Sequence, residues 1–315
     1  MPISTLPSRE AFEVALDVVV AEASPLRLDG KVADYIPALA RVPMDRFGIS
    51  IMTIDGSLFE RDAAREEFSI QSISKLFTLA MAVDLLGDDV WNRIGRSPTN
   101  ASFNALGWLE TERGHPYNPF VNAGALSVSD LVMNRMATPL PALINFLGQA
   151  ADDDGVDIDF EVADSERATC DRNAAIGHLM RSYGTITGPV DALLDLYCQQ
   201  CAIAMSARQL ATARLMFATG GVDARGRRML DPVTTRRINA LLAVAGMYDA
   251  AGEFAFKVGL PAKSGVGGGI LAIVPGLMSI CVWSPALDVQ GNSRAGIAAL
   301  EVLSRELDLS IFRSR

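Results

Sequence analysis

A serine and a lysine three residues apart are the side chains of this chain best suited to covalent chemistry. Ser72 and Lys75 lie in an apolar stretch with helical periodicity, so we expect them on one helix face, one turn apart. A lysine amine in a partly desolvated pocket loses its proton more readily, and the neutral amine can activate a serine hydroxyl as a base. Because Ser-x-x-Lys is short and also occurs by chance, this hypothesis depends on the rest of the sequence.

A second lysine motif lies near the other end of the chain. Lys263 and Ser264 precede Gly265, and further glycines follow at 267–269. Glycines at a strand edge allow the backbone to approach a substrate closely and leave N–H groups free for an oxyanion hole. Ser-x-x-Lys, a helical insert and Lys-Ser-Gly occur in the order of the serine β-lactamase and penicillin-binding-protein motifs. Together they suggest acyl transfer from an amide.

Hydrophobic periodicity predicts the elements that must position these residues. An alternating stretch at 47–54, followed by Asp55-Gly56, predicts a hairpin with a second strand at 57–61. Residues 254–260 and 269–283 are also expected to form strands. If the strands from both ends pair in one antiparallel sheet flanked by helices, the fold is α+β. The expected helices are residues 8–23, 72–86, 125–136, 140–149, 172–183, 189–203, 206–219, 231–245 and 292–307.

Composition and charge argue against several classes of partner. The 315 residues carry a net charge of −9 and no basic stripe, so we expect no nucleic-acid partner. The first ten residues lack a basic segment followed by an apolar run, so we expect no secretory signal and a cytoplasmic location. The apolar stretch 265–283 is broken by glycines and a proline, which favours buried strands over a membrane helix.

Residues that could hold a metal ion are few. Cys198 and Cys201 form a C-x-x-C motif inside an apolar helical pattern, without a second pair, so we interpret them, with Cys170 and Cys281, as buried structural thiols. The acidic run 152–161 has part of the spacing of a calcium loop, but its first ligand position is an alanine. We therefore expect an exposed acidic loop there, no metal and no cofactor.

Seven segments, in order along almost the whole chain, resemble the glutaminase family of serine-dependent amidohydrolases. They are residues 30–37, 71–75, 118–125, 165–177, 194–197, 246–249 and 259–266. The resemblance implies a β-lactamase/transpeptidase-like fold in a single domain, with a sheet subdomain (1–71 and 251–315), a helical subdomain (72–250) and the active site between them. It also implies hydrolysis of the side-chain amide of L-glutamine to L-glutamate and ammonia, and a homo-oligomer, either a dimer or a tetramer.

The same resemblance implies roles for individual residues. Ser72 is the nucleophile, Lys75 takes its proton, and Tyr248 relays protons; whether Tyr248 shares the task of Lys75 is left open. The N–H groups of Ser72 and Val266 form the oxyanion hole. Free glutamine carries a carboxylate and an ammonium, so its pocket needs donors at one end and an anion at the other. The substrate-binding set that the resemblance implies is Tyr35, Ser72, Asn122, Glu166, Asn173, Tyr197, Tyr248 and Val266.

Several of these residues also have a purely structural interpretation. Asn122 could cap the following helix, Tyr197 could be a core residue, Glu166 could be a surface charge, and Tyr248 could simply pack against the sheet. The alternative function is another serine hydrolase of the same fold. It would need a Ser-x-Asn or Tyr-x-Asn motif between the lysine motifs, which the segment at 182–184 does not supply.

Overall fold

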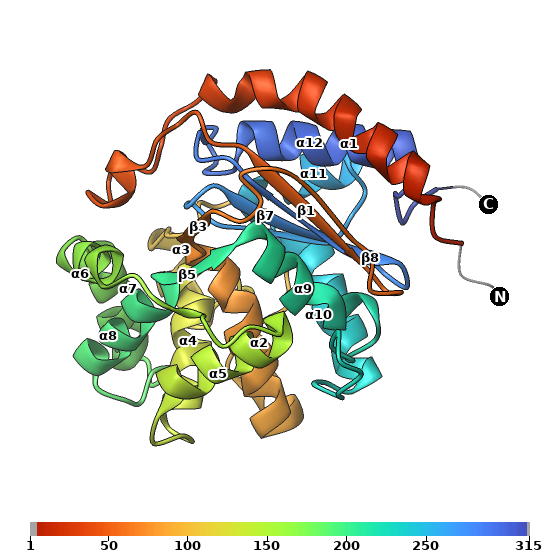
Figure 1. Cartoon of the computed structure of the whole chain (residues 1–315). Helices are drawn as coiled ribbons and strands as arrows, with labels where there is room; N and C mark the ends of the chain where they lie inside the picture. Colours follow the sequence, from red (N-terminus) through yellow and green to blue (C-terminus); the bar gives the residue numbers. More distant parts are fainter. Residues whose placement is uncertain (1–4, 314–315) are drawn as a thin grey trace.

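A five-stranded antiparallel sheet joins the two ends of the chain in the computed structural model, which describes residues 5–313 (Figure 1). Residues 1–4, part of the segment where we expect no export signal, lie outside the described residues. The N-terminal hairpin pairs with the C-terminal strands through β1 and β8, as the sequence predicts. In sheet order the strands are β2 (Leu58–Asp62), β1 (Gly48–Thr53), β8 (Met278–Trp283), β7 (Gly269–Val274) and β6 (Ala262–Ser264).

One face of the sheet is covered by helices from both ends of the chain (Figure 1). The helices α1 (Arg9–Ala23) and α12 (Arg294–Leu307) pack against each other, and α11 (Ala251–Lys257) lies beside them. Alternate strand residues such as Ile49 and Ile280 point into this layer. The strand periodicity of two therefore assigns one set of side chains to this face and leaves the other set for the opposite face.

The opposite face packs against α9 (Ala207–Ala218), which connects the sheet to the helical part of the molecule. One continuous core includes Leu271 and Cys281 from the sheet as well as Phe77 and Leu147 from the helices. The sheet and the helical part thus share a core, and a division into two subdomains stays a prediction. The remaining α-helices are α2 (Ser74–Leu86), α3 (Gly107–Thr111), α4 (Asn122–Met133), α5 (Pro139–Ala151), α6 (Phe160–Ala168), α7 (Asp171–Ser182), α8 (Val190–Cys201) and α10 (Pro232–Ala245).

Short elements connect these helices to the sheet. A small second sheet has the order β3 (Glu67–Ser69), β5 (Ile203–Ser206) and β4 (Asp157–Ile158), and it places the chain just before Ser72. The sequence analysis did not anticipate β3, β4, β5, α3 or α6. The 3₁₀ turns are η1 (Ser24–Leu28), η2 (Leu39–Arg41), η3 (Gln71–Ile73), η4 (Gly87–Asn92) and η5 (Tyr248–Ala250).

The predicted strand at 254–260 is wrong, because this segment contains α11 (Ala251–Lys257). Phe254 is buried whereas Phe256 is 86% exposed, and Glu253 forms an ion pair with Lys257 one turn later. The alternating apolar residues fit a strand equally well, so the decisive signal was the Glu-Lys spacing of four residues. The Lys-Ser-Gly motif consequently lies on β6 itself rather than after a strand.

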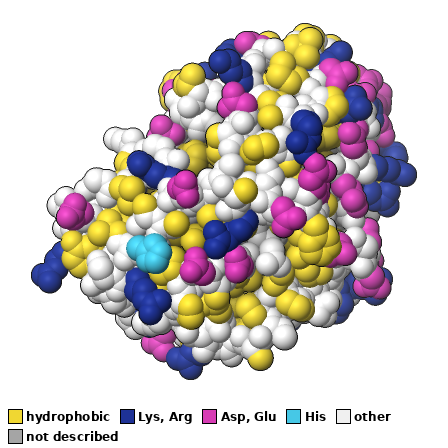
Figure 2. All heavy atoms as spheres, turned by 90° about the vertical axis from the view of Figure 1, so that its left-hand side faces the viewer, with side chains coloured by type: hydrophobic (Ala, Val, Ile, Leu, Met, Phe, Trp, Pro, Cys, Tyr) yellow, Lys and Arg dark blue, Asp and Glu magenta, His cyan; other side chains and the backbone are white. Residues whose placement is uncertain are grey.

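The cysteines agree with the expectation of buried thiols. On the face shown in Figure 2, basic and acidic side chains are interspersed rather than gathered in one patch. All four cysteines are buried and unpaired by disulfides. Within residues 5–313, no helix is long and apolar enough to cross a membrane.

Candidate active site

Ser72 lies in the 3₁₀ turn η3, directly before the N-terminus of α2. Its side chain is buried, and the helix that follows directs the positive end of its dipole toward this turn. The preceding residue, Gln71, adopts a left-handed backbone conformation with φ of 49°. Such a conformation is strained for a residue with a side chain and is often found at functional sites. The predicted helix over 72–86 is thus correct except that it begins at Ser74.

Lys75 is 1% exposed and points into the interior between α2 and α4. Its Nζ donates hydrogen bonds to Oδ1 of Asn122 (2.7 Å) and to the carbonyl oxygen of Phe120 (3.3 Å). Burial lowers the pKa of Lys75 to about 8, against the opposing attraction of Glu166. In residues 5–313 no hydrogen bond joins Lys75 to Ser72. A neutral amine has two N–H donors, so these two bonds leave its lone pair free.

Asn122 is the centre of a buried amide network. It is the first residue of α4, and its side chain makes no capping bond, so the structural alternative for this residue is wrong. Besides Lys75, its Oδ1 accepts a hydrogen bond from the hydroxyl of Tyr197 (3.3 Å), and its Nδ2 donates to Oδ1 of Asn173 (2.8 Å). The network holds the lysine and three of the predicted binding residues in one arrangement.

Glu166 is a buried carboxylate rather than a surface charge, so that structural alternative is also wrong. Its side chain is on α6 and is 9% exposed, and burial raises its pKa to about 7. The side chain of Gln71 is within reach of it and partly offsets this rise in pKa, but Oε2 of Glu166 has no partner within the described chain. An unpaired buried carboxylate is costly, so a cationic ligand group would stabilise it.

Tyr248 and Lys263 lie on the sheet side of Ser72. The Tyr248 hydroxyl donates to the carbonyl oxygen of Ser264 (3.3 Å) and is within hydrogen-bonding reach of Ser72. Its backbone is also left-handed, with φ of 55°. Nζ of Lys263 lies 4.2 Å from the centre of the Tyr248 ring, and burial lowers the pKa of this lysine well below its usual value. The sequence analysis noted Lys263 as part of a motif but did not assign it to the site.

Two glycines let the β6 edge approach the Ser72 turn. A Cβ at Gly265 would lie 2.6 Å from the carbonyl oxygen of Ile70, and one at Gly267 would lie 2.1 Å from that of Ser69. No side chain fits at these distances. Within residues 5–313, the N–H groups of Ser72 and Val266 donate to no other backbone group. They are therefore available to stabilise an oxyanion.

A cavity of about 90 Å³ is lined by most of the residues predicted to form the site. Tyr35 is 54% exposed at its mouth, whereas Lys75 and Tyr248 do not line it and lie behind Ser72 and Asn122. The predicted residues that line it are Tyr35, Ser72, Asn122, Glu166, Asn173, Tyr197 and Val266. The sequence analysis missed Gln71, Phe103, Asn104 and Arg172, which also line it. For Gln71 the signal was its place next to Ser72, and for the other three no pattern indicated a role.

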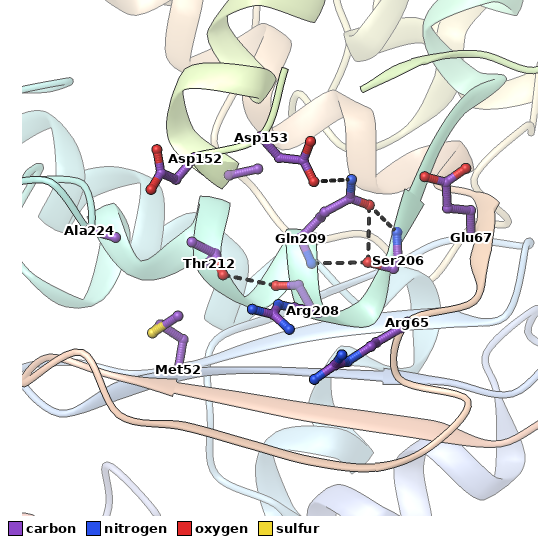
Figure 3. Close-up of a pocket in the computed structure, with 11 residues that line it drawn as sticks. Met52, Arg65, Glu67, Asp152, Asp153, Ser206, Arg208, Gln209, Thr212 and Ala224 are labelled. Atoms are coloured by element: carbon purple, nitrogen blue, oxygen red, sulfur yellow. Dashed lines mark hydrogen bonds between the residues drawn. The ribbon is translucent and has the colours of Figure 1, made fainter. Parts of the chain in front are cut away.

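A larger cavity of about 500 Å³ lies at the N-terminus of α9 (Figure 3). Three of its polar residues pair with one another: Gln209 accepts a hydrogen bond from the N–H of Ser206 and donates to Asp153. Ser206 and Gln209 form the predicted capping box. Asp153 and its neighbours on this loop are exposed, as expected for the acidic run. Despite its size, this cavity offers no serine beside a lysine.

An antiparallel sheet flanked by helices, with a Ser-x-x-Lys pair at a helix N-terminus and a Lys-Ser-Gly edge, is the arrangement of the β-lactamase-like class of hydrolases. The model of the Glutaminase family matches residues 30–312. The chain belongs to the glutaminase family.

Individual relatives agree with this assignment. A glutaminase of Paraburkholderia phytofirmans is 48% identical over 298 residues, which cover 94% of this chain and 98% of the relative. A glutaminase of Shewanella baltica is 49% identical over 298 residues, which again cover 94% of this chain and 98% of the relative. Among solved structures, the probable glutaminase ybaS has a TM-score of 0.92 at 34% identity and covers 98% of this chain and all of its own. Mglu in its glutamate form has a TM-score of 0.90 at 36% identity, covering 98% of this chain and 71% of that one.

Proposed function

We propose that this protein hydrolyses the side-chain amide of L-glutamine to L-glutamate and ammonia. The observation that carries the proposal is a cavity of about 90 Å³ lined by Ser72, by the amides of Asn122 and Asn173, and by Glu166, whose Oε2 has no partner among the described residues. Glu166 would bind the substrate ammonium, and the amide and tyrosine side chains would bind its carboxylate. Membership of the glutaminase family and the likeness to Mglu in its glutamate form support this choice of substrate.

The reaction would proceed through an ester on Ser72. Oγ of Ser72 attacks the amide carbon and its proton passes to neutral Lys75, while the N–H groups of Ser72 and Val266 stabilise the oxyanion. The C–N bond then breaks, and Lys75 returns the proton to the nitrogen, so that ammonia leaves. Water attacks the ester in the second half and releases glutamate. The Tyr248 hydroxyl, within reach of Ser72, is placed to relay protons in both halves.

The state of assembly and the location also belong to the proposal. The family resemblance implies a homo-oligomer, a dimer or a tetramer, which sedimentation of the purified protein would measure. Four buried thiols without disulfides are typical of a reducing compartment and support a cytoplasmic location. A sheet subdomain (1–71 and 251–315) and a helical subdomain (72–250) with the active site between them complete the proposal.

An ammonia-release assay tests the activity directly. L-Glutamine, L-asparagine and the chromogenic β-lactam nitrocefin are compared as substrates of the purified protein. We expect turnover of L-glutamine, because the cavity supplies both an anion and amide donors for a free amino acid. Turnover of nitrocefin without turnover of L-glutamine would instead favour another serine hydrolase of this fold.

A further inference from the structure

The helical part of the molecule contains a second buried amide, that of Gln200 on α8. Gln200 is fully buried and does not line the cavity. Its Oε1 accepts hydrogen bonds from Oγ1 of Thr78 on α2 (3.4 Å) and from Oγ of Ser129 on α4 (3.2 Å). Its Nε2 has no hydrogen-bond partner within the described chain. An unpaired buried N–H is destabilising, and an apolar side chain of the same size would avoid it, so packing alone does not explain a glutamine here.

Gln200 and its two partners lie on the three helices that carry most of the amide network around Lys75. Each of them follows a member of that network by one or two helical turns. The pairs are Lys75 and Thr78 on α2, Asn122 and Ser129 on α4, and Tyr197 and Gln200 on α8. Residues three or seven apart in a helix lie on the same face. The hydrogen bonds of Gln200 therefore connect the same faces of the same helices as those of Asn122.

The distances in the amide network depend on how these helices are spaced. Nζ of Lys75 lies 2.7 Å from Oδ1 of Asn122, and the hydroxyl of Tyr197 lies 3.3 Å from the same oxygen. Most of the other buried residues of α2 are apolar, and apolar contacts have no preferred direction. Hydrogen bonds do have one, because they weaken steeply when their length or angle changes. A displacement of about 1 Å in an active site can lower a rate about 100-fold, so bonds that fix the helix spacing matter for catalysis.

We propose that Gln200 is a positioning residue: it fixes α2, α4 and α8 relative to one another, so that Asn122 holds Lys75 and Tyr197 where catalysis needs them. The proposal rests on the proposed amide hydrolysis. Gln200 touches neither the substrate nor the reacting atoms, and it acts only through the three helices. An amide oxygen has two lone pairs and accepts from two helices at once, which no apolar side chain at this position could do.

Two serines on α4 provide a matched test. Ser129 and Ser127 are both fully buried, but only Ser129 donates to Gln200, whereas Oγ of Ser127 has no partner among the described residues. We expect Ser129→Ala to lower kcat for L-glutamine about fivefold, the factor that corresponds to one ordinary hydrogen bond. Ser127→Ala removes the same atom from the same helix without removing a bond, so kcat should stay within about twofold. Equal kcat values in the two variants would overturn the proposal.

A larger effect is expected from Gln200→Met, which removes both hydrogen bonds and nearly keeps the volume of the side chain. We expect kcat to fall at least about tenfold, because Lys75 is then less well placed to accept the proton of Ser72. KM should rise less than about threefold, since Glu166 and Asn173 contact the substrate from α6 and α7. Urea unfolding shows whether the variant is folded.

A double-mutant cycle with Tyr197→Phe distinguishes positioning from a general effect on stability. If Gln200 acts through the amide network, Gln200→Met and Tyr197→Phe disturb one arrangement, and their effects on kcat should combine to less than their product. Effects that simply multiply are the outcome of a merely structural role and would refute the proposal.

The titration of Lys75 gives a readout that does not require turnover. The chain contains only four lysines, so isotope-labelled lysine gives a simple spectrum in nuclear magnetic resonance, and Lys75→Met identifies the signal of Lys75. Burial lowers the pKa of Lys75 to about 8, and looser helices would admit water to its amine. We expect this pKa to rise by at least about half a unit in Gln200→Met and to stay unchanged in Ser127→Ala.

The same titration separates failure of this proposal from failure of the proposed function. If the protein does not hydrolyse L-glutamine, the proposed function fails, and the pKa of Lys75 alone decides the role of Gln200. A Lys75 pKa that is the same in Gln200→Met and in the wild type would overturn that role. Should Gln200→Met not fold, Ser129→Ala takes its place, and a Lys75 pKa equal to that in Ser127→Ala would be the contradicting result.

Discussion

Of the two cavities described above, the larger is not the one with the reactive groups. The cavity at Ser72 holds about 90 Å³, whereas the one at the N-terminus of α9 holds about 500 Å³ (Figure 3). In the large cavity, Ser206 and Gln209 close a capping box and Gln209 also binds Asp153. In the small one, Oε2 of Glu166 has no partner among the described residues. Behind its wall, burial lowers the pKa of Lys75 to about 8.

This difference shows that polar groups without hydrogen-bond partners, rather than the volume of a cavity, identify the site. Polar groups that satisfy one another stabilise a helix end and have nothing left for a ligand. Burial shifts the pKa values of the Glu166 carboxylate and the Lys75 amine. The carboxylate is then ready to bind a cationic substrate group, and the amine is ready to accept a proton. Matched substitutions in the two hollows should therefore have opposite effects on turnover and on stability.

The largest contrast is expected between Ser72→Ala and Ser206→Ala. Loss of the nucleophile should lower kcat for L-glutamine by at least about 10³-fold and leave the protein folded, since Ser72 caps no helix. Loss of the Ser206 cap should cost about 1 kcal/mol of unfolding free energy and change kcat less than twofold. Ammonia release and urea unfolding measure the two effects. Substantial turnover by Ser72→Ala would refute the assignment of the nucleophile.

A smaller contrast is expected between Glu166→Gln and Asp153→Asn. Glu166→Gln keeps the shape but removes the charge that would bind the substrate ammonium, so KM should rise about 10–100-fold. Asp153 contacts Gln209 and the N–H of Gly155 in the large cavity, and its substitution should leave KM within twofold. Steady-state kinetics at pH 8 distinguish them. Equal KM values for the two variants would show that Glu166 does not bind the ammonium.

The smallest effect is the pH dependence of the wild type. Lys75, with its pKa lowered to about 8, must be neutral to accept a proton, and Glu166, with its pKa raised to about 7, must be ionised to bind an ammonium. Both requirements are met increasingly as the pH rises. The neutral fraction of Lys75 increases about tenfold between pH 7 and 9, and kcat should follow it. A kcat that is constant over this interval would argue against Lys75 as the base.

The sequence predicted most of the fold because the helices carry strong local signals. The capping box at Ser206, the N-cap at Asp231 and the break at Gly87 all mark helix ends in the structure. The sheet followed from strands at both ends of the chain. The strand expected at 254–260 failed, because alternating apolar residues over seven positions fit a helix and a strand alike.

The site was predictable as a set of residues but not as a geometry. Family resemblance pointed to Glu166 and Asn122, yet local sequence favoured a surface charge for the first and left a helix cap open for the second. Their burial arises from contacts between α4, α6, α7 and α8 that no local pattern encodes. The left-handed backbone of Gln71 and the approach of Lys263 to the ring of Tyr248 depend in the same way on segments distant in the chain.

The close approach of β6 to the Ser72 turn has a consequence for the synthesis of this protein. The two N–H groups available to an oxyanion come from Ser72 and Val266, and β6 reaches its place only through β7 and β8. A partly synthesised chain that lacks β7 and β8 should therefore be inactive, because these late-translated strands complete the site. Ammonia production during translation would report the moment at which the C-terminal strands join the N-terminal hairpin.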